Sequence, residues 1–151
     1  MRSIVVLAAA ISLAVAGVAD AKQKVKIVQS SGTIQGHLAR PSTAEGYTFA
    51  GFVNDSKLGT GATTSQGNSD GPTTSGTLIV FVAKGTLRAT FHFDVTANAD
   101  GTVTFQGTTK YTGGTGAYKG AKGSGHTNGA QDAHGYTTFE YTQTVKIPKH
   151  D

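Results

Sequence analysis

Apolar and polar residues alternate with a period of two along much of this chain. The clearest example is the segment 86–96, in which apolar side chains occupy every second position between polar or charged ones. This pattern predicts a strand with one face in a core and the other in solvent. The apolar positions are Leu87, Ala89, Phe91, Phe93 and Val95. The preceding run 77–83 is apolar at every position after Thr77, which predicts a strand buried on both faces, and Lys84-Gly85 supplies a hairpin turn between the two.

Further alternating segments predict more strands. Val103 and Phe105 begin one strand after the turn at 98–101, and the segment 135–147 forms another, which Pro148 ends. Phe139, Tyr141, Val145 and Ile147 share one face of it. The segments 25–28, 33–38 and 47–53 are shorter candidates interrupted by glycine. The segment 59–76 contains almost no apolar residue and predicts a mobile surface loop, either a lid or an inert insertion.

The N-terminus predicts a removable signal peptide. Arg2 precedes an apolar run over residues 4–18, and Ala19-Asp20-Ala21 offers the small residues that signal peptidase requires. Cleavage after Ala21 would leave residues 22–151 as one domain, with no transmembrane segment, in a secreted or periplasmic location. The short Arg-led signal and the lack of cysteine are typical of a bacterial protein.

Seven or eight strands with short turns predict an all-β domain. The chain contains no cysteine, so the domain has no disulfide, and thiol nucleophiles, thiolate metal sites and redox motifs are excluded. A closed antiparallel barrel of eight strands is the favoured architecture because closure hides the strand edges. A β-sandwich is the alternative.

A glycine-rich segment follows the central strands. Its sequence, residues 112–125, is Thr-Gly-Gly-Thr-Gly-Ala-Tyr-Lys-Gly-Ala-Lys-Gly-Ser-Gly. Glycines permit a sharp reversal here, and an aromatic residue can cover the turn as an apolar plug. The residues assigned to this structural turn are Gly113, Gly114, Gly116, Tyr118, Gly120 and Gly123.

This segment resembles the glycine-rich motif of the allene oxide cyclase-like and dirigent-like barrels, with likeness over about residues 76–125. The resemblance implies an eight-stranded antiparallel barrel, often oligomeric, whose apolar interior holds a hydrophobic small molecule. In one branch of that superfamily the molecule is cyclised, and in the other it is steered during radical coupling. No catalytic residue of the superfamily can be placed on this sequence.

Charge adds little to the functional picture. The formal net charge is +4, but the lysines are scattered and are not interleaved with aromatic residues, so a nucleic-acid partner is not expected. Lys22, Lys24 and Lys26 would project from one face of a strand, as an edge-protecting row or as a contact with an anionic surface.

Several polar residues are candidates for chemistry. His92 and Asp94 share a strand face, and Glu45 and Glu140 could form an acid pair, although alternation turns His92, Asp94 and Glu140 toward solvent.

The loop-like stretch around residues 126–134 offers metal-ligand types without an established spacing, so no metal or other cofactor is expected. These candidate ligands are His126, Asp132 and His134. Asn54-Asp55-Ser56 matches a glycosylation acceptor.

Two functions remain open. The first is a non-catalytic exported barrel that binds a hydrophobic small molecule or has an envelope or interaction role. The second is an isomerase or cyclase of the allene oxide cyclase type. A carboxyl or histidine directed into an apolar cavity would distinguish them.

Overall fold

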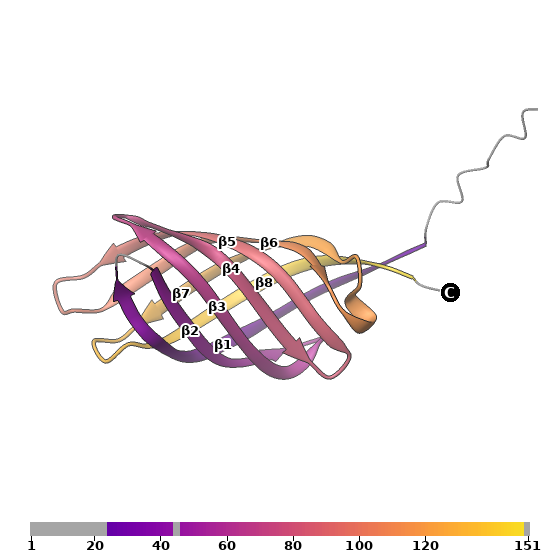
Figure 1. Cartoon of the computed structure of the whole chain (residues 1–151), viewed down its shortest axis with the longest axis horizontal. Coiled ribbons are helices and arrows are strands. Elements are labelled where there is room, and N and C mark those ends of the chain that lie inside the picture. The colour runs from indigo at the N-terminus through magenta and orange to yellow at the C-terminus, as the bar shows by residue number, and fades with distance from the viewer. Residues whose placement is uncertain (1–23, 44–45, 150–151) are drawn as a thin grey trace, which may run out of the picture.

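The chain forms a closed antiparallel barrel of eight strands, each paired with its neighbours in sequence order (Figure 1). The structure is a computed structural model that describes residues 24–43 and 46–149. The strands, with one 3-10 helix, are β1 (Val25–Thr43), β2 (Gly46–Asp55), β3 (Gly59–Asp70), β4 (Thr73–Val82), β5 (Gly85–Ala97), β6 (Val103–Gly114), η1 (Gly116–Tyr118), β7 (Lys122–Gln131) and β8 (Tyr136–Pro148). Among the described residues, no helix has the length and apolarity needed to cross a bilayer.

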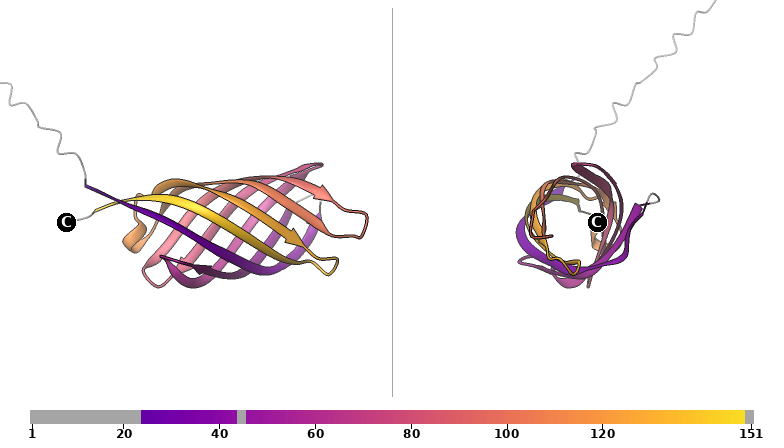
Figure 2. Two further views of the ribbon diagram at one scale, coloured as in Figure 1. Left: turned by 180° about the vertical axis from the view of Figure 1, so that it is seen from behind. Right: turned by 90° about the vertical axis from the view of Figure 1, so that its left-hand side faces the viewer.

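Pairing between the first and last strands closes the barrel. β1 pairs with β8 from Val25↔Pro148 to His37↔Tyr136, and its later residues also pair with β2. The strands are tilted and form a ring when viewed along the barrel (Figure 2). The predicted closed barrel is therefore confirmed. The segments 25–28 and 33–38 belong to one strand, β1. Gly32 and Gly36 do not interrupt it; they lie where neighbouring atoms leave no room for a Cβ.

The prediction of a mobile loop at 59–76 is wrong. Residues 59–70 form β3, which pairs along its length with β2 and β4. The polar sequence of this segment suggested a loop, but a threonine hydroxyl can be buried in the barrel when it has a hydrogen-bond acceptor. Thr63 Oγ1 donates to the Ile79 carbonyl at 3.0 Å. Glycine in β3 also allows β4 to approach closely, since a Cβ on Gly61 would lie 2.0 Å from the Phe81 carbonyl oxygen.

Strand β4 is buried on one face only. The barrel is a single layer, so alternate positions of β4 reach solvent on its outside, and Phe81 is 45% exposed there. The prediction of burial on both faces is therefore wrong. The apolar face of β5 does point inward, and Arg88, Thr90 and the other alternate residues point outward.

The two ends of the barrel differ. One end, called here the closed end, carries the start of β1, the end of β8 and η1. Tyr118 of η1 is buried against the core cluster that fills this end, and Gly116 makes the turn with a φ of 57°. Gly114 has no positive φ and instead permits close contact with the Thr86 carbonyl oxygen. The other end, the mouth, carries the β1–β2, β3–β4, β5–β6 and β7–β8 connections.

Candidate functional site

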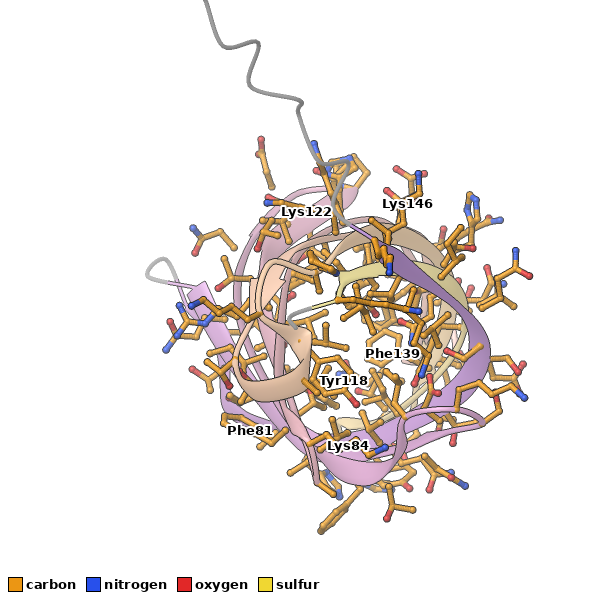
Figure 3. The ribbon with its side chains drawn as sticks, turned by 90° about the vertical axis from the view of Figure 1, so that its right-hand side faces the viewer. Phe81, Lys84, Tyr118, Lys122, Phe139 and Lys146 are labelled. Atoms are coloured by element: carbon orange, nitrogen blue, oxygen red, sulfur yellow. The ribbon has the colours of Figure 1, made fainter. Side chains whose placement is uncertain are left out.

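A cavity of about 230 Å³ occupies the interior between the middle of the barrel and its mouth. Phenylalanines from four strands make much of its wall, because each stands at an inward position of its strand. Phe91 and Phe93 stack at 5.0 Å between ring centroids, and Phe139 lies 5.5 Å from Phe105 and 5.8 Å from Phe93. Figure 3 shows Phe139 inside the ring of strands. The wall therefore favours an apolar, flat molecule.

Most polar side chains in this wall are already hydrogen-bonded within the protein. The Tyr47 hydroxyl pairs with Thr74 Oγ1 at 3.0 Å, and Gln131 Nε2 donates to Thr137 Oγ1 at 3.0 Å. Burial raises the pKa of Tyr47. Among the described residues, no buried side-chain nitrogen or oxygen lacks a hydrogen-bond partner. A ligand in the cavity is therefore not required to satisfy an orphan polar group.

A buried carboxylate lies in the closed half, where β2 ends. Asp55 is 3% exposed, and its Oδ2 accepts hydrogen bonds of 2.9 Å from Ser30 Oγ, the Tyr141 hydroxyl and Gln143 Nε2. Its Oδ1 accepts the backbone N–H groups of Lys57 and Leu58, each at 2.8 Å, as the chain turns toward β3. These five donors occupy both carboxylate oxygens.

Two tyrosines of this network, Tyr111 and Tyr141, border a small void next to the main cavity. The Tyr111 hydroxyl donates to Gln143 Oε1, and a small void of about 20 Å³ beside Tyr111, Tyr141 and Gln143 shares wall residues with the main cavity. Burial, and then the charge of Asp55, raises the pKa of both tyrosines well above the ordinary value. Both hydroxyls are therefore neutral near physiological pH and act as hydrogen-bond donors.

The hydrogen-bond network around Asp55 can orient polar groups on the closed-end side of the cavity, but none of its side chains is free to transfer a proton. Asp55 already accepts hydrogen bonds at both oxygens, and the tyrosine protons are committed to Asp55 and Gln143. None of the described residues that line the main cavity is Asp, Glu, His, Lys or Arg. Shape and apolar contact are what this site offers most strongly.

The sequence candidates for catalysis lie elsewhere. His92 and Asp94 are exposed on the outside of β5, and Glu140 is exposed on the outside of β8. Alternation with inward phenylalanines sends all three side chains away from the cavity. Glu45 falls outside the described residues.

The candidate metal ligands do not converge. His126 is on the outer face of β7, whereas Asp132 and His134 lie in the β7–β8 turn. Asp132 Oδ1 accepts the backbone N–H groups of Tyr136 and His134, each at 2.9 Å, which lowers the pKa of Asp132 and shapes the turn. Across residues 24–43 and 46–149, no group of three His, Cys, Asp or Glu residues is suited to a metal ion.

The buried network was missed from the sequence. Gln143 stands on the apolar face of β8 between Tyr141 and Val145, and an amide at such a position needs a buried partner. That position was a usable signal. The sequence pattern marks Asp55 only as the middle residue of a glycosylation acceptor, and its alternation predicts the strand of Tyr111 only as far as residue 106.

Comparison with solved structures identifies dirigent proteins among the neighbours of this barrel. The pterocarpan synthase dirigent protein GePTS1 matches with a TM-score of 0.52 and 16% identity, covering 85% of this chain and 88% of that one. The pterocarpan synthase dirigent protein PsPTS1 matches with a TM-score of 0.54 and 14% identity, covering 84% and 97%. No protein-family model and no curated protein sequence matches this chain. At these identities the likeness shows the dirigent barrel fold.

Proposed function

We propose that this protein is an exported barrel that binds one small apolar molecule in the mouth half of its interior. The observation that carries the proposal is the cavity of about 230 Å³ walled by phenylalanines. An apolar cavity of about 150 Å³ in another protein holds benzene, so a molecule of one or two fused rings fits this volume. The export step is the one predicted from residues 1–21.

Two further features support binding through shape. Most polar side chains in the cavity wall already have hydrogen-bond partners within the protein, so the ligand needs few polar groups of its own. The closed half is filled by side chains and by Tyr118, so the occupant is limited to the mouth half. The two dirigent neighbours are described as pterocarpan synthases, which provides an analogy of a like barrel in small-molecule chemistry.

Native mass spectrometry of the exported protein, purified without detergent, tests the proposal. We expect one reproducible adduct, which organic extraction releases as a small apolar compound. An apo mass together with an empty extract would contradict the proposal. Conversion of an added apolar compound, rather than its retention unchanged, would favour the isomerase or cyclase alternative.

A further inference from the structure

Charge is distributed unequally between the two ends of the barrel. The exposed lysines of the closed end occupy its strand ends and turns: Lys24, Lys26, Lys57, Lys84, Lys119, Lys122, Lys146 and Lys149. In Figure 3, which views this end, Lys84, Lys122 and Lys146 lie around the central Tyr118. Among the described residues, the mouth half has the opposite sign, since it carries four aspartates against one arginine, Arg40 of β1: Asp70, Asp94, Asp100 and Asp132. Asp55, the carboxylate described in the closed half, is buried within its network.

The closed end also has a groove that combines lysines with apolar surface. The apolar lining includes the exposed Ile27 and the plug residue Tyr118. The lysines along it are Lys26, Lys57, Lys84 and Lys149. We call this surface the closed-end groove.

Exposed aliphatic side chains alternate with lysines at the edge of this groove. Val25 is 48% exposed and Ile27 is 60% exposed, and they follow Lys24 and Lys26 respectively along β1. The β1 and β8 ends project beyond the rest of the barrel (Figure 1), held by a 2.8 Å hydrogen bond from the Lys149 N–H to the Lys24 carbonyl. The most protruding part of the molecule is therefore both cationic and apolar.

We propose that the closed end binds the surface of an anionic lipid bilayer, with the mouth directed away from it. Lysines near such a surface are attracted to its headgroups, each strengthening binding about fivefold. Exposed aliphatic side chains gain from entering the boundary between headgroups and acyl chains, which a hydrophilic polyanion does not offer. The carboxylates at the mouth are repelled from the same surface, which fixes the orientation.

Orientation by the closed end leaves the mouth facing solvent. The bilayer contact involves only the outer surface of the barrel and is independent of a ligand in the cavity.

Vesicle sedimentation tests the surface. We expect the exported protein to bind vesicles with roughly one-third phosphatidylglycerol in phosphatidylcholine and not pure phosphatidylcholine. Raising the salt from about 0.05 M to about 0.5 M should release it. Lack of binding to the anionic vesicles, or equal binding to both compositions, would overturn the proposal.

A matched pair of variants locates the contact. Lys57→Gln with Lys84→Gln should weaken binding by roughly 10-fold or more, whereas Arg88→Gln with Lys110→Gln on the outer wall removes the same charge and should weaken it less than about threefold. Lys57 and Lys84 form hydrogen bonds through main-chain atoms, which the substitutions leave in place, so the variant should fold. Equal losses in the two variants would show an effect of net charge alone and overturn the assigned face.

Tryptophan reporters test the orientation, since the chain has no tryptophan. Ile27→Trp places the only indole at the closed end, and Ala99→Trp places it in the exposed β5–β6 turn of the mouth. On anionic vesicles we expect the first to shift to shorter wavelength and to be quenched by brominated lipids, and the second to remain unchanged. Quenching of the mouth reporter, or of neither reporter, would overturn the orientation.

Discussion

The two halves of the barrel interior use the same strands in opposite ways. In the closed half, Leu87, Val145 and Tyr118 fill the space to near-complete burial, and Asp55 gathers hydrogen bonds from several strands. In the mouth half, phenylalanines line the wall but leave a cavity of about 230 Å³. A closed barrel of this size therefore separates stability and binding along its axis: one half is packed and the other can receive a molecule.

Replacement of the buried carboxylate should produce the largest effect. Asp55→Ala leaves three side-chain donors and two backbone N–H groups without their acceptor, so we expect a loss of about 4 kcal/mol in the free energy of unfolding. Denaturant titration measures it. Asp94→Ala, on the exposed outer face of β5, is the control and should change stability by less than about 0.5 kcal/mol. Similar losses in both variants would contradict a central role for Asp55.

Truncating one aromatic side chain in each half tests whether the two halves differ in packing. Tyr118→Ala removes the buried plug and should cost about 3 kcal/mol, as is usual for large aromatic truncations in packed cores. Phe105→Ala removes a ring that already borders the cavity and should cost about 1.5 kcal/mol. Calorimetric melting of both variants measures the difference, and an equal or reversed order would show that the halves are packed alike.

Alkaline pH should weaken the closed half by a smaller amount. The folded-state pKa of Tyr141 is raised above the ordinary value of 10.0, so its contribution is fully present below that pH. It is lost as the pH rises above that value, because the unfolded chain releases the proton first. We expect the melting temperature to fall more steeply above about pH 10 in the wild type than in Tyr141→Phe. Parallel profiles would show that Tyr141 does not contribute to the alkaline loss.

Alternation alone predicted much of the fold but little of the site. The inward face of β5 and the closed barrel follow from period-two patterning and from the need to hide strand edges. Strand β3 was missed because its inward positions are threonine and serine, whose hydroxyls bond within the barrel in ways that a hydropathy pattern does not show. Polarity is a poor guide to burial where a local acceptor is available.

The buried network was hidden for a different reason. Ser30, Asp55 and Gln143 come from separate strands, with up to 113 positions between hydrogen-bonded partners. Only the registers of β1 with β2 and β8 bring them together. The sequence could flag Gln143 as an amide on an apolar face, but its partners depend on barrel closure. The outward positions of His92, Asp94 and Glu140, in contrast, follow directly from alternation.

Binding of naphthalene, a two-ring apolar probe, can be followed by its fluorescence and tests directly whether the mouth half receives a molecule. Ser65 of β3 lines the cavity, and the adjacent residue Gln66 is exposed on the outside of the same strand. Ser65→Leu and Gln66→Leu therefore place the same side chain inside and outside the barrel. We predict saturable binding to the wild type and to Gln66→Leu, weakened at least about tenfold by Ser65→Leu because the added side chain fills the cavity. No saturable binding to the wild type, or equal weakening by the two variants, would contradict the claim that the mouth half is a binding cavity.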